Sequence, residues 1–243
     1  MRYFIEFAYK GTHYHGSQVQ PNGTTVQQVM QDAMATILRH PVELTFAGRT
    51  DAGVHAAQMF AHWDSEAIVS PALADRLNRL LPKDIAVYRI FPVADDLHAR
   101  FSATSRTYEY RITMRKDPFV SDTRTRIATP LDFAAMNRAA QHLIGTHDFA
   151  SFCKVHTDVK TTFCTVTEAY WREEENGAVF TITADRFLRN MVRAVVGTLF
   201  DIGRGKITLQ QLDDILSACN RQAAGQSAPP EGLFLVRVTY PFG

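Results

Sequence analysis

The sequence has few cysteines, and none of them is spaced for a metal site or a disulfide framework. Its 243 residues include Cys153, Cys164 and Cys219, with no Cys-x-x-Cys pair. Small secreted scaffolds and structural zinc sites depend on paired or closely spaced cysteines. We therefore expect three reduced thiols, buried as small side chains, and no bound metal.

A long apolar run is also missing. The longest helix-like apolar stretch, residues 187–200, is interrupted by Arg189, Asn190 and Arg193, whereas a membrane span needs about 18 apolar residues. Residues 1–6 alternate in the manner of a strand and lack the pattern of a signal peptide. These observations predict a cytoplasmic protein without a membrane segment.

Neither sign of charge predominates in the composition. Lysine and arginine total 26 against 25 aspartate and glutamate residues, which gives a formal net charge of +1. A near-neutral sum does not mark a nucleic-acid-binding protein, but the distribution of charge matters more than its sum. This distribution is compatible with a locally positive groove, because basic residues recur at Arg49, Arg100, Arg106, Arg111, Arg115, Lys116, Arg186, Arg189, Arg193, Arg204 and Lys206.

The hydrophobic periodicities predict an α+β protein. An apolar fraction of 46% and a charged fraction of 21% are ordinary for a globular chain. Alternation with period two predicts strands and helical spacing predicts helices. The expected strands are 2–9, 42–47, 57–63, 85–91, 101–114, 163–171, 178–184 and 233–240. The expected helices are one with apolar positions from Val26 to Leu38 that ends near His40-Pro41, and 71–81, 131–144, 187–202 and 208–219. Thr24 and Gln27 have the spacing of a capping box at the first helix.

The order of these elements is βαββαβ-like in each half of the chain. We expect two ferredoxin-like halves that share a mostly antiparallel sheet, with helices on one face. Residues 1–100 would form an N-terminal half and residues 101–243 a C-terminal half.

One short segment, Gly48-Arg49-Thr50-Asp51-Ala52-Gly53-Val54-His55, is the strongest candidate for a functional site. Its single acid lies in a turn between two expected strands, where a carboxylate is poor core material but is well placed at the mouth of a cleft. Loops fixed by rigid strands often carry catalytic groups, and Gly48 and Gly53 permit backbone angles and close approaches that other residues resist. Asp51 is therefore either a reactive carboxylate or an ordinary turn residue.

This segment resembles the active-site motif of the TruA-type tRNA pseudouridine synthases, and further segments agree with that family in the same order. Two positions depart from the family pattern: Lys10 stands where an aspartate is frequent, and Ser17 where a tryptophan or another aromatic is frequent. Both lie outside the Asp51 segment, so they affect the expected substrate contacts more than the chemistry. The similar segments are 9–20, His98-Ala99-Arg100-Phe101-Ser102-Ala103, Arg106-Thr107-Tyr108-Glu109-Tyr110, His147-Asp148-Phe149 with Phe152, Phe187-Leu188 with Met191-Val192-Arg193, Gly197-Thr198-Leu199, Ala228-Pro229 and Gly232-Leu233.

The resemblance implies the pseudouridine synthase fold and the isomerisation of uridine to pseudouridine in tRNA, at about positions 38 to 40 of the anticodon stem-loop. The bond between C1′ and N1 breaks, the uracil turns, and C1′ rejoins through C5, so no atom is gained or lost overall. No cofactor is needed, which agrees with the absence of a dinucleotide-binding or P-loop signature. The family works as a homodimer on one tRNA, without a metal.

The resemblance also assigns roles to five residues. Asp51 would be the catalytic carboxylate, either as a nucleophile at C1′ or as a base at the 2′ position. Arg193 would be its cationic partner, since a nearby guanidinium keeps a carboxylate ionised. Tyr108 would lie against the uracil, Arg49 would help to evict the base or fill its vacancy, and Leu188 would close the pocket.

These residues also have ordinary structural interpretations. Arg193 and Arg49 could be an exposed helix arginine and a phosphate contact, and Leu188 could simply pack its helix. Tyr108 and Tyr110 share a face of an extended chain, and Tyr110 is the one expected in the core. We expect His55 to support the loop of Asp51 without taking part in the chemistry.

Three other functions compete with this interpretation. A retaining glycosidase also attacks an anomeric carbon, but it needs a second carboxylate about 5 Å away, and Asp148 and Asp185 are weak candidates for it. A non-catalytic RNA-binding module of ferredoxin-like fold would bind RNA through surface aromatics, but it would not require Asp51. The same chemistry on another RNA is the third alternative.

Overall fold

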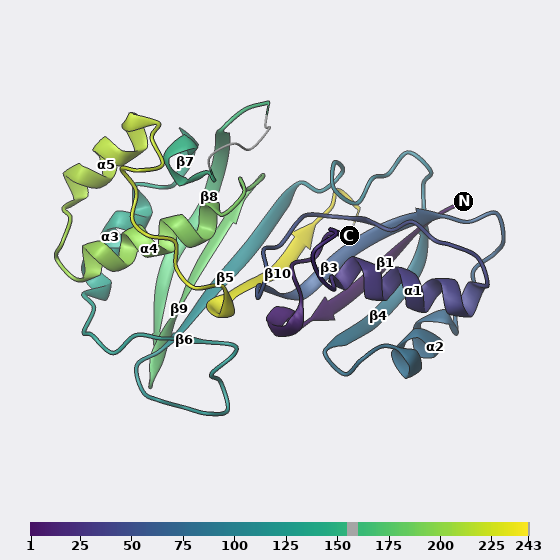
Figure 1. The fold of residues 1–243 in the computed structure, drawn as a ribbon. Coiled ribbons are helices and arrows are strands. Elements are labelled where there is room, and N and C mark those ends of the chain that lie inside the picture. The colour runs from purple at the N-terminus through teal and green to yellow at the C-terminus, as the bar shows by residue number, and fades with distance from the viewer. Residues whose placement is uncertain (155–159, 243) are drawn as a thin grey trace. The chain divides into compact units, whose positions relative to one another are not determined.

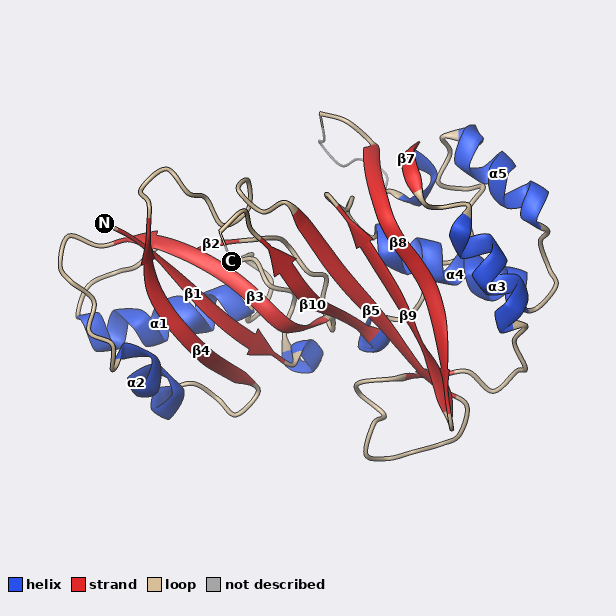
Figure 2. Ribbon diagram, turned by 180° about the vertical axis from the view of Figure 1, so that it is seen from behind, coloured by secondary structure: helices blue, strands red, loops and turns tan. Residues whose placement is uncertain are grey.

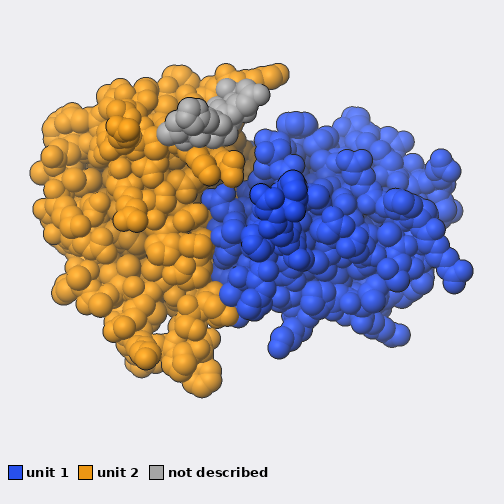
Figure 3. Space-filling view, in the orientation of Figure 1, with its two compact units in different colours: residues 1–104, 235–243 blue, residues 105–234 orange. Residues whose placement is uncertain are grey.

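The structure, a computed structural model, describes residues 1–154 and 160–242. The chain divides into two compact units (Figure 3). Unit 1 contains residues 1–104 and 235–243, and unit 2 contains residues 105–234. The sequence analysis placed everything after residue 100 in one half, whereas the last residues of the chain belong with the first unit.

Unit 1 has the βαββαβ order that the sequence predicts. Its strands follow the hydrogen-bonded order β4-β1-β3-β10, and the short β2 pairs with β3. The pairs β1 with β3 and β1 with β4 are antiparallel. Its elements are β1 (Arg2–Tyr9), η1 (Gly11–His13), α1 (Val26–Leu38), β2 (Thr45–Phe46), β3 (His55–Asp64), α2 (Leu73–Leu80), β4 (Ile85–Val93) and β10 (Leu233–Thr239), which begins in unit 2.

Helices α1 and α2 lie over one face of these strands (Figure 1). The N-cap of α1 is Thr25, whose side chain accepts a hydrogen bond from the backbone N–H of Gln28. The expected capping box of Thr24 and Gln27 is therefore wrong. Gln27 is used elsewhere, because its Nε2 donates to Leu44 O at 2.6 Å.

The strand expected at 42–47 is reduced to two residues. The backbone carbonyl of Leu44 accepts from Gln27, and its backbone N–H donates to Gln31 Oε1 at 3.0 Å. Side chains of α1 therefore take the hydrogen bonds that a longer β2 would have used. The segment before the Asp51 loop is fixed to the helix as well as to the sheet.

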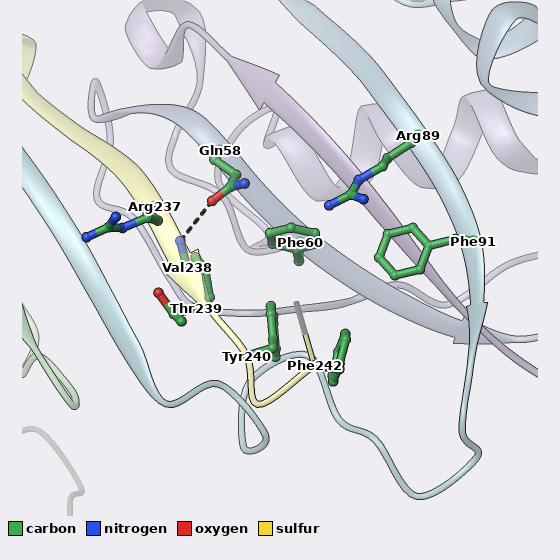
Figure 4. Close-up of a pocket in the computed structure, with 9 residues that line it drawn as sticks. All are labelled: Gln58, Phe60, Arg89, Phe91, Arg237, Val238, Thr239, Tyr240 and Phe242. Carbon is green, nitrogen blue, oxygen red and sulfur yellow. Dashed lines mark hydrogen bonds between the residues drawn. The ribbon is translucent and has the colours of Figure 1, made fainter.

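An aromatic cluster covers the face of the unit 1 strands that the helices leave open. Phe4 is fully buried, and its ring centroid lies 5.3 Å from that of Tyr240 and 5.8 Å from that of Phe242. A shallow hollow of about 230 Å³ lies there, with Phe60 and Phe91 among its walls (Figure 4). The C-terminal residues thus complete the core of the N-terminal unit.

Unit 2 contributes mostly antiparallel strands with helices over one face (Figure 2). Its strands follow the order β5-β9-β8-β7, and β6 pairs with β5. Among the strand pairs with a described register, β5 with β6 is the parallel one. The elements are β5 (Ser105–Thr113), β6 (Thr125–Arg126), α3 (Phe133–Gln141), β7 (Gly145–Asp148), η2 (Ala150–Phe152), β8 (Phe163–Glu174), β9 (Gly177–Ala184), α4 (Met191–Gly203), α5 (Leu209–Ala218) and η3 (Pro230–Gly232).

Among the boundaries in unit 2 that differ from the prediction, two have an identifiable local cause. Helix α4 begins at Met191 and not at residue 187, because Asn190 adopts a left-handed conformation with φ of 67° and ends the irregular segment before it. Strand β5 begins at Ser105, because residues 98–102 form a turn closed by a hydrogen bond from Ser102 N to His98 O. The α+β class and the antiparallel pairing are confirmed.

The cysteines are only partly as expected. Cys153 and Cys164 are buried, but Cys219 is exposed at the end of α5. Burial raises the pKa of the Cys164 thiol to about 12, which makes it an inert core residue. Within residues 1–154 and 160–242, no helix is both long and apolar enough to cross a bilayer.

Candidate active site

Asp51 lies in the loop between β2 and β3, and the residue before it is firmly held. The backbone N–H of Thr50 donates to Ser17 Oγ at 2.8 Å, and Ser17 N donates to Thr50 O at 3.1 Å. The hydroxyls of Thr50 and Tyr9 are 2.8 Å apart. Because Ser17 and Thr50 are buried and Asp51 is partly exposed, the loop presents a carboxylate on a fixed backbone.

The glycines of this region do not all have the role that the sequence suggested. Gly53 has φ of 79° and Gly16 has φ of 90°, a conformation that L side chains rarely adopt. A Cβ on Gly16 would also lie 2.8 Å from Thr50 O. By contrast, Gly48 has no left-handed φ, and a Cβ built there meets no atom within 4 Å. The expected steric need for glycine at position 48 is therefore wrong.

His55 closes the other end of the loop as a buried support. It is fully buried, and its Nδ1 accepts a hydrogen bond from Gly11 N at 2.9 Å. Gly11 must be small, since a Cβ there would lie 2.0 Å from Val54 O. Val54 N in turn donates to Asp51 O at 3.1 Å. These contacts fit the structural role that the sequence analysis gave to His55.

Arg49 precedes the buried Thr50 and is exposed. It lines a hollow of about 240 Å³ beside the loop, together with Gly48, His98, Arg100 and Phe101. A guanidinium at such a rim can reach a phosphate or a base. The structure thus places Arg49 and Asp51 in the same loop of unit 1, with the hollow adjacent to them.

Tyr108 lies on β5 in unit 2, opposite Ile182 of β9. It is partly exposed, and its ring packs edge-on against Phe187, with centroids 5.0 Å apart and an interplanar angle of 83°. Tyr110 is fully buried; its hydroxyl donates to Pro229 O and lies 2.7 Å from Thr125 Oγ1. The assignment of Tyr110 to the core is confirmed, and Phe187 is a neighbour of Tyr108 that the sequence analysis did not identify.

Arg193 lies in the first turn of α4 and is tied to the loop that precedes β10. Its Nε donates to Ala228 O at 2.7 Å, and Ala228 N donates to the backbone O of Arg193 at 2.8 Å. The first bond fixes the position of Nε, and the second holds the backbone of Arg193 to the same loop. Leu188 is buried, 5% exposed, in the segment before the helix. Leu188 therefore lies outside α4, whereas the sequence analysis expected it inside a helix.

The candidate residues come from both units of the chain. Asp51 and Arg49 belong to unit 1, and Tyr108, Leu188 and Arg193 belong to unit 2. The ion pair between Asp51 and Arg193 stays a prediction.

Several of the basic residues that suggested a positive groove are paired with acids. Arg111 Nη2 lies 2.7 Å from Glu109 Oε2, and Arg204 and Lys206 lie 3.6 and 3.4 Å from the same oxygen of Asp201. Arg111 also stacks its guanidinium 4.0 Å from the Phe234 ring centroid. These side chains contribute less net positive charge than the sequence suggested. Among the described residues, no cluster of three or more His, Cys, Asp or Glu side chains could hold a metal ion.

The fold and the Asp51 loop together define an α+β protein with a carboxylate fixed between two strands, and comparison with known proteins identifies its family. The family model described as "tRNA pseudouridine synthase" matches residues 6–102 and 139–241. The chain belongs to the tRNA pseudouridine synthase family, an enzyme family of isomerases.

Full-length relatives agree with this assignment. The chain is 55% identical over 243 residues to a protein named tRNA pseudouridine synthase A from Bacteroides fragilis, covering 99% of this chain and 96% of the relative. It is 53% identical to the protein of that name from Parabacteroides distasonis and 46% identical to the one from Azobacteroides pseudotrichonymphae, with 99% of this chain covered and 96% and 97% of the relatives. The alignments extend over both units.

Proposed function

We propose that this chain isomerises uridine to pseudouridine in tRNA and that Asp51 is the catalytic carboxylate. Membership of the tRNA pseudouridine synthase family supports the reaction class. The observation that carries the assignment of Asp51 is the fixation of its loop by Ser17, Tyr9 and His55. These buried hydrogen bonds hold the backbone next to Asp51 in place, which a reacting carboxylate requires.

The reaction explains why a carboxylate is required. As the bond between C1′ and N1 breaks, the sugar becomes electron-poor, and an anion held nearby can attack C1′ or remove the 2′ proton. When C1′ rejoins through C5, the C5 proton must leave while N1 ends with a proton. A carboxylate on a rigid backbone supplies the negative charge without the cost of reorganising solvent.

The remaining candidates would complete the site from both parts of the chain. Tyr108 would lie against the uracil, and its edge contact with Phe187 would keep the ring from rotating. Arg193, held through Ala228, would pair with Asp51 and keep it ionised. Leu188 would seal the base from water, and Arg49 would displace the base from its stack or occupy the vacancy.

We further propose that the targets are uridines at about positions 38 to 40 of the anticodon stem-loop and that the chain acts as a homodimer in the cytoplasm. Two copies would combine two modest basic surfaces on one tRNA, which reconciles a formal net charge of +1 with binding of a polyanion.

The test is the release of tritium from tRNA that carries 5-tritiated uridine. The native chain should release tritium to water, and Asp51→Asn, which keeps the shape and removes the anion, should release none while it still binds tRNA. Asp201→Asn is a suitable control, because Asp201 lies in α4 beside Arg204 and Lys206 and is a partly exposed ion-pairing carboxylate. Full activity of Asp51→Asn would refute the assignment, and binding without release by the native chain would favour a non-catalytic RNA-binding module.

A further inference from the structure

We propose that the hollow beside the Asp51 loop holds a second unstacked nucleobase of the bound RNA, a chain neighbour of the uridine that is isomerised. This inference rests on the proposed function and adds a binding site to it. The hollow has a volume of about 240 Å³ and is lined by residues of three unit 1 segments, 18–27, 43–49 and 98–101. Sites for drug-sized ligands usually exceed about 300 Å³, so this one suits a single ring system.

One wall of the hollow is an exposed aromatic stack. The Phe101 side chain is 75% exposed, and its ring centroid lies 4.4 Å from that of His98. The Arg100 guanidinium lies 5.6 Å from the centroid of the same ring. Unpaired bases of RNA are held on aromatic rings and on guanidinium planes of this kind. Most of the Phe101 side chain is therefore left exposed beside these two contacts, where a base could pack against it.

A lone exposed phenylalanine is common on protein surfaces, but this one lies on a turn that is fixed by its own hydrogen bonds. Ser102 N donates to His98 O, and His98 N donates to Ser102 Oγ, both at 2.9 Å. The Nδ1 of His98 accepts from the backbone N–H groups of Arg100 and Phe101 at 3.0 and 3.3 Å. The backbone that carries the Phe101 ring is thus held in place before any ligand arrives, which lowers the entropic cost of binding.

The turn is also anchored to the sheet from two sides. Ala99 is fully buried; its N–H donates to His62 Nδ1 at 3.1 Å, and its carbonyl accepts from Tyr240 Oη at 2.6 Å. Tyr240 belongs to the aromatic cluster of the C-terminal segment (Figure 4). Strand β3 and the end of the chain therefore both position the platform formed by His98 and Phe101.

The charges around the hollow favour a base inside it and a phosphate at its rim. The hollow is lined by two cationic side chains and one carboxylate, those of Arg49, Arg100 and Glu43. Burial, followed by the charges of Arg2 and Arg100, lowers the pKa of His98, so its imidazole is neutral at pH 7. A neutral ring suits stacking, whereas Glu43 would repel a phosphate placed inside the hollow.

Gly48 leaves the hollow open. A Cβ built on it meets no atom within 4 Å, and its backbone is not left-handed. A side chain at position 48 would fill space that the fold does not use. The proposed base would use that space, which makes Gly48→Val a steric test of the site that removes no hydrogen bond of the loop.

The test uses anticodon stem-loop RNA with 2-aminopurine at the nucleotide on either side of the target uridine. Because 2-aminopurine is quenched by stacking on neighbouring bases, its extrusion into the hollow should raise the fluorescence of one of the two RNAs on binding. Phe101→Ala should abolish this fluorescence rise and weaken RNA binding about 5- to 150-fold, the equivalent of ~1–3 kcal/mol of base stacking. Phe101→Trp should retain the fluorescence change and the RNA affinity. Phe119→Ala removes a 92% exposed phenylalanine of unit 2 and should alter neither quantity.

Tritium release separates this inference from the proposed function. In Phe101→Ala and Gly48→Val, KM for the RNA should rise more than kcat falls, because the platform binds the ground state and the transition state alike. If the native chain releases tritium but Phe101→Ala matches it in the fluorescence rise and in KM, the second-base site is wrong and the proposed function stands. If the native chain releases no tritium, the proposed function itself fails.

Discussion

Ser17 and Thr50 form a two-way backbone clamp immediately before the candidate catalytic residue. Ser17 Oγ accepts from Thr50 N at 2.8 Å, and Ser17 N donates to Thr50 O at 3.1 Å, so both backbone polar groups of Thr50 are paired. Ser17 is a position at which the sequence departs from the family pattern, which frequently has an aromatic residue there. In this fold it anchors the loop of Asp51 to the segment that leads into α1.

Removal of the Ser17 hydroxyl should therefore weaken the site as well as the fold. Ser17→Ala leaves the buried N–H of Thr50 without its acceptor, at a cost of about 1–3 kcal/mol in the free energy of unfolding. Because displacement of a reacting group by about 1 Å can cost about 10²-fold in rate, we expect single-turnover tritium release to slow by about 10- to 100-fold. Urea denaturation and single-turnover kinetics measure the two effects.

Ser151 provides the matched control for this variant. It is equally buried, its Oγ donates to Ile215 O at 2.6 Å, and the same oxygen accepts from Asn220 N at 2.9 Å. Ser151→Ala should lower stability to a similar degree and leave the single-turnover rate near the native value. Equal rate losses in the two variants would mean that general destabilisation, and not the clamp on Thr50, explains the effect.

His62 should make the fold of unit 1 sensitive to acid. Burial, followed by the charges of His98 and Arg2, lowers the pKa of His62 to about 4 from an ordinary value of 6.5, although Asp64 opposes this. Below pH 6.5 the His62 imidazole is protonated in the unfolded chain but stays neutral in the folded chain until the pH approaches 4. The free energy of unfolding therefore decreases as the pH falls from about 6.5 to about 4. The loss should reach about 3 kcal/mol, measured by urea denaturation at a series of pH values.

His62→Asn supplies the comparison. Asparagine keeps an acceptor for the N–H of Ala99 that His62 Nδ1 now serves, but it does not titrate. The variant should be less stable than the native chain at pH 7 and should show a shallower decline between pH 6.5 and pH 4. Parallel declines in the two proteins would show that other groups cause the acid sensitivity.

Arg193 should not be replaceable by lysine. Its Nε donates to Ala228 O at 2.7 Å, the proposed pairing with Asp51 would use its other guanidinium nitrogens, and an ammonium cannot make both contacts in one plane. Arg193→Lys and Arg193→Ala should each lose about 100-fold or more in kcat, with a stability loss of about 1–3 kcal/mol. Near-native turnover of Arg193→Lys would show that a point charge suffices and that the planar pairing with Asp51 is wrong.

Binding of tRNA should depend steeply on salt. Each phosphate neutralised by a lysine or arginine contributes a slope of about −0.7 to −0.9 in a plot of log binding constant against log salt concentration. Arg100→Gln, at the rim of the hollow beside Phe101, should reduce that slope by about one unit, and Arg172→Gln, which removes the side chain paired with Glu174, should not. A flat salt response of the native chain would contradict the proposed phosphate contacts.

Much of the fold follows from local patterns in the sequence. Strand β1 and helix α1 begin and end where their alternating and helical periodicities do, because burial of one face is a local requirement. The capping box of α5 at Thr208 and Gln211 is of the same kind. At β2 the local pattern failed because distant side chains competed for the same backbone atoms. Gln27 and Gln31 shortened β2 by binding Leu44, and no local pattern near residue 44 records their presence.

The sequence by itself determined the α+β class, the position of Asp51 in a turn between strands, and the resemblance that led to the family. Only the tertiary structure decided what holds that turn, since Ser17 and Thr50 are 33 residues apart and Tyr240 and Ala99 are 141 apart. It also showed that Gly48 borders open space while Gly16 is required by its backbone. The physical reason is that a hydrogen-bond partner or a free volume is set by which segments pack together, whereas periodicity reports only which face of a segment is buried.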